Sequence, residues 1–361
     1  MTDSGGSARL RVDDFDYELP DDAIAQAPAE PRDSSRLLVL DRRRSSSGIP
    51  ALAHGTFGEL GQWLRPGDLL VVNDSRVMPA RLRGRRATGG SVELLVLRPL
   101  GDARGRWEAL VRPSRKVGVG ETISIGGNAS VGGGERVADG TRAVRFDGDA
   151  HAVMAAVGEM PLPPYIHDRS APAERYQTVY AEPPGSAAAP TAGLHFTAEL
   201  LDQLAANGVG RASVTLHVGL DTFRPLEGEF VDEHHIHREW FEVPATTRDA
   251  IASTRGSGGR VVAVGTTAVR VLETAARQGA ASGWTDLYIT PPHRFAQVDA
   301  LITNFHLPRS SLLLLVTAFV QAGMGADVSV VGARDVLLAA YREALVTGYR
   351  FFSFGDAMLI V

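Results

Sequence analysis

The chain has 361 residues, of which 44% are hydrophobic and 22% are charged, so it can form the cores of two soluble domains. Its formal net charge of −5 at pH 7 means that an anionic partner needs a local basic surface. The lack of cysteine excludes disulfides, thiolate nucleophiles, cysteine-bound zinc and iron–sulfur clusters. The polar N-terminus and a longest apolar run of nine residues (312–320) are typical neither of a signal peptide nor of a membrane span, and we expect a cytoplasmic protein.

Residues 1–76 predict mixed α/β structure. Short apolar runs at Leu37–Leu40 and Asp68–Asn73 indicate buried strands. Between them, Thr56–Leu64 has the apolar spacing of a helix, and Pro66 with Gly67 ends it.

Residues 77–168 differ from both flanks because short strand-like runs follow one another without a helical stretch. Glycine-rich segments such as Gly132–Gly134 indicate turns between these runs, and the proline-rich Met160–Tyr165 leads out of the region. This pattern favours a small β-barrel or sandwich. The predicted strands cover 91–97, 106–111, 121–125 and 142–146.

Beyond about Glu174, strands and helices alternate again, which predicts a sheet covered by helices. The predicted helices are 200–206 and 267–276, and the predicted strands are 212–218 and 261–264. We therefore predict an α/β fold in which a large, sandwich-like α/β domain is interrupted by a small inserted β-barrel. The large catalytic domain would be discontinuous, with residues 1–76 and 169–361, and the β-barrel domain would cover 77–168.

Seven of the ten histidines lie between Pro190 and His306, and most of them stand beside turn residues and apolar stretches. Loops on a rigid scaffold often present proton-handling groups in this way, so we expect the functional site here. The spacing of His234, His237 and Glu239 is compatible with metal binding, but neither a strand nor a helix puts all three on one face. We therefore favour acid–base or hydrogen-bonding work over a metal site, and a structural role stays open for each histidine.

The segment 260–270 predicts a buried strand, a glycine turn and the start of a helix. The free N–H groups at Gly265, Thr266 and Thr267 and the helix dipole can bind a carboxylate or phosphate, with Arg270 nearby. A plain strand-to-helix turn with a good cap is the alternative.

Basic clusters in or beside the predicted β domain can form a phosphate-binding face. The alternative for each cluster is an ordinary solvated surface. The candidate residues are Arg81, Arg83, Arg85, Arg86, Arg115 and Lys116, and Arg42–Arg44 form a further cluster.

Many of these segments, in order and nearly end to end, resemble one family. They include Asp14–Pro20, Ala27–Asp33, Gly67–Val71, Pro79–Leu82, Pro161–Ile166, Glu174–Ala181, Pro190–Thr197, Leu216–Gly219, His234–Glu239, Val264–Thr267, Ile302–Pro308 and Tyr349–Ile360. The chain is similar to the S-adenosylmethionine:tRNA ribosyltransferase-isomerases, the epoxyqueuosine-forming enzymes of queuosine biosynthesis. The family fold, a large α/β domain with a small inserted β-barrel, agrees with the fold predicted from the residues.

The resemblance implies a reaction that composition does not show. The ribosyl part of S-adenosylmethionine moves to the aminomethyl group of a 7-deazaguanine at the wobble position of tRNA, and adenine and methionine leave. S-adenosylmethionine is then a consumed co-substrate, and we expect no cofactor and no metal. The expected partners are S-adenosylmethionine and the tRNA that carries the 7-deazaguanine precursor, with no membrane, and we expect a monomer.

On this hypothesis, residues from distant segments converge on one cleft. We expect His195 or His217 to remove a proton from the 5′ carbon, which the sulfonium acidifies. Glu239 or Asp299 would orient that base or serve the leaving adenine. The helix start at 265–267 would bind the methionine carboxylate, and the basic clusters would bind tRNA phosphates. The predicted catalytic set is His195, His217, His237, Glu239, Asp299, Asn304 and His306.

Three departures from the family pattern leave the acceptor open. Asp221 stands where the family usually has glycine, His293 where an aromatic residue is usual, and 321–334 extend a connection that is normally shorter. One alternative is a related enzyme that acts on a free nucleobase or another small amine. The other is a non-catalytic RNA-binding protein that has kept the fold.

Overall fold

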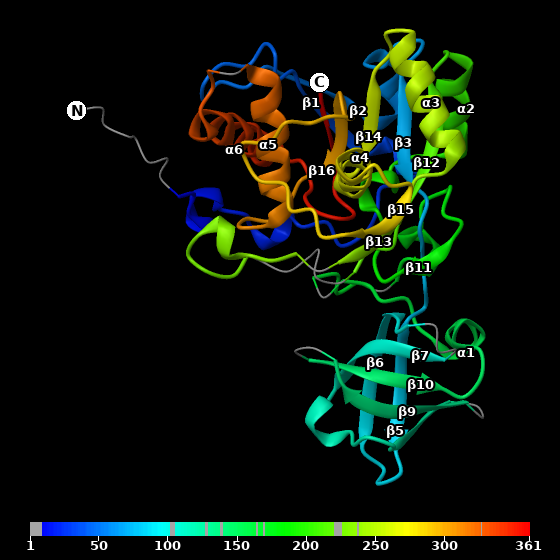
Figure 1. The fold of residues 1–361 in the computed structure, drawn as a ribbon. Helices are drawn as coiled ribbons and strands as arrows, with labels where there is room; N and C mark the ends of the chain where they lie inside the picture. The colour runs from blue at the N-terminus through cyan, green and yellow to red at the C-terminus, as the bar shows by residue number, and fades with distance from the viewer. Residues whose placement is uncertain are drawn as a thin grey trace.

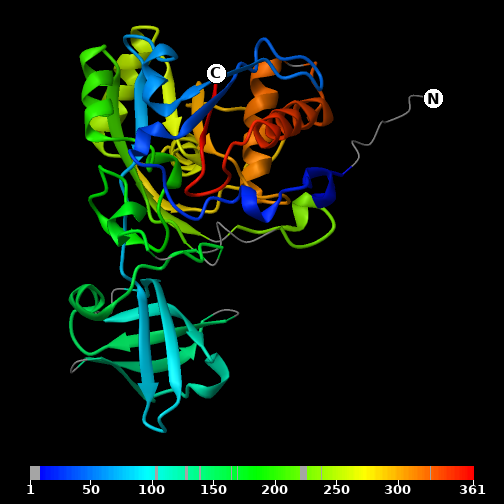
Figure 2. The ribbon, with the colours of Figure 1, turned by 180° about the vertical axis from the view of Figure 1, so that it is seen from behind.

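The computed structural model describes residues 9–101, 105–126, 129–137, 140–163, 165–168, 170–219, 226–236, 238–325 and 327–361. They form a large α/β body and a β-barrel that lies beneath it in Figure 1 and, from behind, in Figure 2. No helix among these residues is both long enough and apolar enough to cross a bilayer.

Within the described chain, nine strands form the sheet of the large body in the order β15-β13-β12-β3-β14-β16-β17-β1-β2. The four central strands β12, β3, β14 and β16 are parallel, and β17, β13, β15 and β2 introduce antiparallel pairs. The bounds are β1 Arg36–Leu40, β2 Leu52–Thr56, β3 Leu69–Asn73, β12 Gly210–Leu216, β13 Glu239–Glu242, β14 Val261–Val264, β15 Ser282–Thr285, β16 Ala300–Asn304 and β17 Ala357–Ile360.

Both faces of this sheet are buried because its strands are apolar at successive positions. Leu69 and Val71 of β3 point into one core, and Leu70 and Val72 point into the other, as the two-residue period of a strand requires. The first core packs against α4 (Thr266–Gln278), α5 (Ser311–Met324) and α6 (Val330–Val346), and α3 (Ala245–Gly256) lies beside it. The second packs against α2 (Ala198–Ala206) and the 3-10 helix η4 (Phe57–Gln62).

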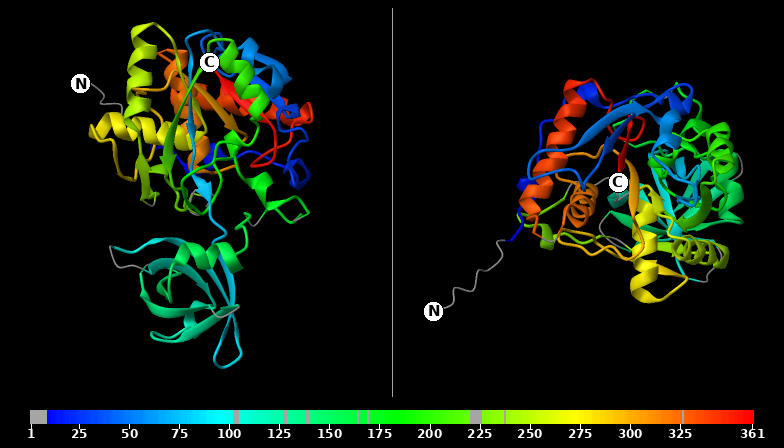
Figure 3. Two further views of the ribbon diagram at one scale, coloured as in Figure 1. Left: turned by 90° about the vertical axis from the view of Figure 1, so that its right-hand side faces the viewer. Right: turned by 90° about the horizontal axis from the view of Figure 1, so that it is seen from above.

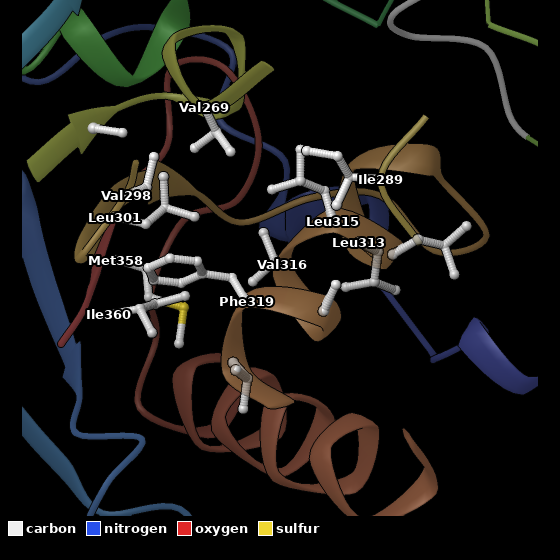
Figure 4. Packing of buried hydrophobic residues seen from close by; sticks show 14 of the residues in the cluster. Val269, Ile289, Val298, Leu301, Leu313, Leu315, Val316, Phe319, Met358 and Ile360 are labelled. Atoms are coloured by element: carbon white, nitrogen blue, oxygen red, sulfur yellow. The ribbon is translucent and has the colours of Figure 1, made fainter. Parts of the chain in front are cut away.

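The first core is well packed at its centre. Figure 4 shows Val316 and Phe319 of α5 beside Leu301, Met358 and Val269, which come from β16, β17 and α4. Figure 3 shows from two further sides how the helices cover the sheet. In open α/β sheets, ligands bind at the carboxyl ends of the parallel strands.

The inserted region is a closed barrel with the strand order β10-β7-β6-β5-β8-β9. The bounds are β5 Arg81–Arg86, β6 Ser91–Pro99, β7 Arg106–Arg112, β8 Thr122–Gly126, β9 Ala129–Arg136 and β10 Thr141–Phe146. Helix α1 (Ala150–Val157) then closes one end, with Met154 in the barrel core. The chain enters the barrel just after β4 (Arg76–Val77), which pairs with β11 (Pro184–Ser186) of the returning chain.

The predicted fold class, an α/β body with an inserted β-barrel, is confirmed. The domain boundaries at 77 and 168 stay a prediction. Three details of the sequence analysis are wrong. First, 77–168 were expected to lack a helix, but they contain α1. Second, a helix with α-helical spacing was expected over 56–64, but 57–62 form a 3-10 helix.

The third error concerns glycine. Gly132–Gly134 lie inside strand β9 and do not form a turn. A Cβ on Gly133 would come within 2.7 Å of the carbonyl oxygen of Gly118, and one on Gly134 within 2.7 Å of that of Ala143. These glycines therefore allow two backbones to approach closely in the small barrel.

Candidate active site

A pocket lies at the carboxyl ends of the neighbouring parallel strands β14 and β16. Its wall consists of Ala189–Ala192, Gly265–Thr267, Thr303, Asn304, His306, Phe352 and Ser353, with Val218 and Leu312. The wall residues come from five separate parts of the sequence, and Asn304 and His306 are the members of the predicted catalytic set among them. Open α/β sheets bind ligands at this edge.

The start of α4 forms one side of the pocket. Gly265 has φ of +88° and donates its backbone N–H to the Ile302 carbonyl (2.8 Å), so the chain turns sharply from β14 into the helix. No side chain caps this helix start within the described chain. The Oγ1 atom of Thr267 is buried in the pocket wall and has no hydrogen-bond partner among the described residues. This combination of unused donors and a helix N-terminus is suited to an anion.

His195 lies behind this wall with both ring nitrogens engaged. The amide nitrogen of Asn304 donates to the Phe352 carbonyl (3.2 Å), and this contact orients the amide so that its NH2 group also donates to Nε2 of His195 (3.2 Å). Nδ1 therefore carries the proton and donates to Ser35 Oγ (2.8 Å). Burial, with Arg350 and Arg32 nearby, lowers the pKa of His195 to about 3. His195 is thus a neutral part of the wall.

His217 lies just beyond the end of β12 and has a different environment. Ser75 donates its hydroxyl proton to Ser186 Oγ (3.0 Å), so its oxygen is an acceptor for Nδ1–H of His217 (2.7 Å). This arrangement leaves Nε2 of His217 as an unprotonated nitrogen with no partner among the described residues. Burial lowers the pKa of His217 to about 4, so the ring is neutral near pH 7.

Two neighbours fix the ring plane of His217. The indole of Trp240 lies parallel to it, with 5.3 Å between ring centroids and 20° between planes. The second neighbour is Gly185, where a Cβ would lie only 2.4 Å from the imidazole. A glycine is therefore required there for the ring to occupy this position.

His306 contributes directly to the pocket wall. Its Nε2 contacts Thr303 Oγ1 (2.9 Å), and its backbone N–H donates to the Tyr341 hydroxyl (3.2 Å). Tyr17 donates its hydroxyl to the carbonyl of the same residue. Burial lowers the pKa of His306 to about 3, so this imidazole is also neutral.

Glu239 and Arg270 form a buried ion pair beside the pocket. Glu239 also accepts the backbone N–H of Gly219 (2.7 Å), and Arg270 donates to the Leu287 carbonyl (3.2 Å). The Arg270 guanidinium is one turn into α4 and does not line the pocket. The ion pair therefore fixes the chain next to Val218, because the Glu239 carboxylate also accepts the backbone N–H of Gly219.

Asp299 was expected in the same cleft, and this expectation is wrong. It precedes β16 at the amino end of the strand, whereas Asn304 and His306 lie at the carboxyl end, so the length of the strand separates them. Its carboxylate accepts the backbone N–H of Val261 (2.8 Å) and thereby ties β14 to β16. Spacing along the chain does not reveal which end of a strand a residue occupies.

His237 of the predicted catalytic set, the candidate metal cluster and the two residues that depart from the family pattern remain to be placed. His237 and Asp221 lie outside the described residues. Among the residues that the structure does describe, no group of three or more histidine or acidic side chains is placed to hold a metal. His293 packs edge-on against Phe295 at a distance of 4.7 Å between ring centroids, so it occupies an aromatic position within an aromatic cluster.

Comparison with known proteins gives full-length matches. A family model for "Queuosine biosynthesis protein" matches residues 12–360. The S-adenosylmethionine:tRNA ribosyltransferase-isomerase of Symbiobacterium thermophilum is 51% identical over 360 residues, which cover 98% of this chain and 100% of that protein. The protein of that name from Heliobacterium modesticaldum is 51% identical over 359 residues, which cover 96% of this chain and 98% of that protein.

The chain belongs to the queuosine biosynthesis protein family. A solved relative within it is a crystal structure of S-adenosylmethionine tRNA ribosyltransferase from Thermotoga maritima. That structure is 41% identical, with a TM-score of 0.54, and the match covers 96% of this chain and 100% of the other. The family resemblance found in the sequence is therefore confirmed.

The basic residues of this family member occupy two different sides of the barrel. Arg81, Arg83 and Arg85 alternate along β5 and point outward, whereas Arg86 points the other way into an ion pair with Glu121 (2.6 Å). Arg86 therefore does not share a face with the others as expected. Arg83 pairs with Glu159 (2.9 Å), while Arg85 lies with Arg112 around a surface hollow. Arg115 and Lys116 follow on the 3-10 helix η5 (Ser114–Lys116) and are exposed.

The sequence analysis missed several polar residues that complete the site. Ser35 and Ser75 contact the two histidines, and Ser186 accepts the hydroxyl of Ser75, but isolated serines carry no signal of their own in a sequence. Phe352 has φ of +71°, an unusual value for an aromatic residue, and its carbonyl holds Asn304. Such backbone strain close to a pocket becomes visible only in a structure.

Proposed function

We propose that this chain transfers and isomerises the ribosyl moiety of S-adenosylmethionine onto the aminomethyl-7-deazaguanine wobble base of tRNA. The product is epoxyqueuosine in tRNA, and adenine and methionine are released. The observation that carries the proposal is the end-to-end match to relatives named for this transfer, together with a pocket whose helix start is suited to a carboxylate. We further propose that the protein acts in the cytoplasm as a monomer.

In the proposed complex, the methionine carboxylate binds the backbone N–H groups of Thr266 and Thr267 and the Oγ1 atom of Thr267, because the N–H of Gly265 already donates to the Ile302 carbonyl. This position uses the donors that the protein leaves unpaired and the positive end of the α4 dipole. The rest of S-adenosylmethionine then extends along the carboxyl ends of the strands, past His306 and towards His217. Arg270 supports the helix start from behind through its pair with Glu239.

His217 is the proposed general base, because its Nε2 has no hydrogen-bond partner among the described residues and can accept a proton. Both ring nitrogens of His195 already form hydrogen bonds. It takes a proton from the 5′ carbon, which the adjacent sulfonium acidifies. Adenine leaves with the electrons of its glycosidic bond and takes up a proton, and methionine leaves with the electrons of the carbon–sulfur bond. The electron pair of the broken C–H bond stays on the 5′ carbon and closes the five-membered carbon ring at C1′ as adenine leaves. The acceptor amine forms the new carbon–nitrogen bond at C4′ and loses a proton. The ring oxygen is released from C4′ and displaces methionine from the 5′ carbon, which closes the epoxide. Proton transfer and positioning suffice for these steps, so we propose that no metal or redox cofactor takes part.

The proposed tRNA contact is the outer face of the barrel, with Arg81, Arg83, Arg85, Arg115 and Lys116, to which the structure adds Arg112. Arg85, Arg112, Arg115 and Lys116 form no ion pair among the described residues, so their charges are available for phosphates. Replacing these four with glutamine should weaken tRNA binding and flatten its salt dependence, while S-adenosylmethionine binding is spared. Unchanged affinity and salt slope would place the contact elsewhere.

The deciding experiment measures adenine release from S-adenosylmethionine with different acceptors. We expect release with tRNA that carries the aminomethyl-7-deazaguanine, and a matching mass increase on that tRNA. The same tRNA with guanine at the wobble position is the matched control and should give none. Release with the free nucleobase but not with tRNA would instead identify the alternative, an enzyme for a small amine acceptor.

A further inference from the structure

Three ring side chains form a row across the end of the large sheet. His217 donates its backbone N–H to the Trp240 carbonyl (3.0 Å), and Trp240 on β13 lies directly opposite Trp284 on β15. Cross-strand neighbours point to the same face, so all three rings share one side. The alternating residues Leu216 and Phe241 point to the other side and are buried in the core. We call His217, Trp240 and Trp284 the aromatic row.

The aromatic row becomes more exposed from one end to the other. His217 and Trp240 are partly buried and parallel, 5.3 Å apart. Trp284 on the edge strand β15 is 39% exposed, so its ring is accessible to a ligand. The row therefore leads from solvent to the histidine that the proposed function uses as its base.

The barrel supplies a cation to the exposed end of this row. The guanidinium of Arg98 on β6 lies 5.5 Å from the centroid of the Trp284 ring, and it is held by Glu108 (2.7 Å). Figure 1 shows the barrel beneath the edge formed by β13 and β15. The row and Arg98 together thus line the junction of the two parts of the molecule, where a ligand bound to the barrel would pass on its way to the pocket.

We propose that the aromatic row is a stacking platform for the unpaired nucleobases that flank the modified base of an RNA loop. The proposal rests on the proposed function and names the part of the substrate that the row recognises. Flat aromatic faces beside a guanidinium are how proteins bind splayed-out bases, and every base has a face that can stack. A base at the reacting position would then approach His217, and its neighbours would lie against Trp240 and Trp284.

The chemistry of this surface favours a single-stranded RNA over the other possible occupants. Bases within an A-form duplex are stacked on each other and cannot reach a row of rings, whereas loop bases can be splayed out. Arg85 and Arg112 of the barrel, which form no ion pair among the described residues, attract the phosphates on either side of such bases.

The test measures binding of an anticodon stem–loop RNA to the full chain without S-adenosylmethionine. Trp284→Leu keeps an apolar side chain but removes the ring, and we expect its Kd to rise about tenfold. Trp284→Phe keeps a ring and should stay within about twofold of the unchanged protein. A duplex with the same stem and no loop should bind weakly and equally to all three. Thermal unfolding of each variant confirms that the fold is intact.

A fluorescence measurement gives a second readout. Stem–loop binding should quench the indole fluorescence of the unchanged protein, and Trp284→Phe should lose a large part of that quench while it still binds. Equal affinity of Trp284→Leu and the unchanged protein for the stem–loop would overturn the proposal. So would equal binding of duplex and loop, or a dimer that Trp284→Leu dissociates, because the row would then bind a second copy of the chain.

Failure of this inference is distinguishable from failure of the proposed function. If the unchanged protein releases adenine with the modified tRNA but Trp284→Leu binds the stem–loop normally, only the stacking platform is wrong. If the unchanged protein releases no adenine with that tRNA, the proposed function itself is wrong.

Discussion

His195 and His217 have the same chemical neighbours in different arrangements. In each ring, Nδ1 is hydrogen-bonded to a serine hydroxyl. The ring of His195 lies near Phe57, and the ring of His217 lies near Trp240. The difference is at Nε2, which accepts from Asn304 in His195 and which has no partner among the described residues in His217. A histidine with two partners positions its neighbours, whereas one with a free nitrogen can take a proton. The environment of a histidine, more than its presence near a pocket, therefore decides its role.

The largest expected effect is the loss of the base. His217→Ala should lower the rate of adenine release about a hundredfold or more, because a general base typically contributes at least this factor. S-adenosylmethionine binding should change little. The diagnostic measurement is exchange of the 5′ protons of bound S-adenosylmethionine with solvent, which should disappear in this variant.

His195→Gln is the matched comparison for that experiment. A glutamine can still bond Ser35 or Asn304, so the wall is partly kept, and exchange at the 5′ carbon should persist. If exchange were lost in His195→Gln and retained in His217→Ala, the roles of the two histidines would be reversed.

Acid should destabilise the protein through its buried histidines. The pKa of His195 is about 3 in the folded chain against an ordinary value of 6.5, so below pH 6.5 the unfolded chain takes up a proton that the folded chain refuses. Stability is therefore full above pH 6.5 and falls as the pH drops towards 3. At pH 5, this residue alone should cost about 2 kcal/mol, on the basis of 1.36 kcal/mol per pKa unit.

Denaturant unfolding at pH 7 and pH 5 measures this effect. His195→Gln removes the titrating group, so the difference in the free energy of unfolding between the two pH values should shrink relative to the unchanged chain. An unchanged pH dependence in the variant would mean that His195 does not carry the acid sensitivity.

The hydrogen bond between Ser75 and His217 determines which ring nitrogen of His217 carries the proton, so a change at Ser75 tests how His217 differs from His195. Ser75→Ala removes the acceptor for Nδ1–H, so the proton is no longer held away from Nε2, and we expect adenine release to fall about tenfold (about 1.4 kcal/mol). Nitrogen NMR of His217 should show Nδ1–H in the unchanged protein and a mixture in the variant. A pure Nε2–H form in the unchanged protein would contradict the arrangement.

Ser35→Ala is the corresponding change at His195. It also removes a serine from Nδ1 of a buried histidine, but it should affect stability more than turnover. Equal losses of turnover in the two serine variants would remove the distinction between the two networks.

The sequence predicted the architecture better than the site. The apolar runs of β1, β3 and β14 and the glycine turn before α4 predicted their elements because local pattern and tertiary burial agree there. Gly132–Gly134 failed because glycine marks both turns and close backbone contacts, and only the barrel shows which one applies.

The site residues illustrate a different limit. Sequence patterns identified His195, Asn304 and His306 as neighbours in function, but they also grouped Asp299 with them although it lies at the opposite end of β16. The hydrogen bonds of Ser75 and Ser186 depend on where β3, β11 and β12 end in space, which no local pattern encodes. The assignment of roles to these residues thus needs three-dimensional contacts.

The smallest predicted effect concerns the start of α4, where the buried hydroxyl of Thr267 has no hydrogen-bond partner in the part of the chain that the structure describes. Thr267→Val replaces it with a methyl group of similar size, so the free protein should be as stable as before or more stable by up to about 1 kcal/mol. The same change should weaken S-adenosylmethionine binding by about 1 kcal/mol, because the ligand carboxylate loses a donor. Calorimetric titration and thermal unfolding measure the two effects separately. Thr317→Val, which removes a hydroxyl bonded to the Leu313 carbonyl, is the control and should lower stability alone. If Thr267→Val lowered stability and left binding unchanged, the start of α4 would be a structural turn and not an anion site.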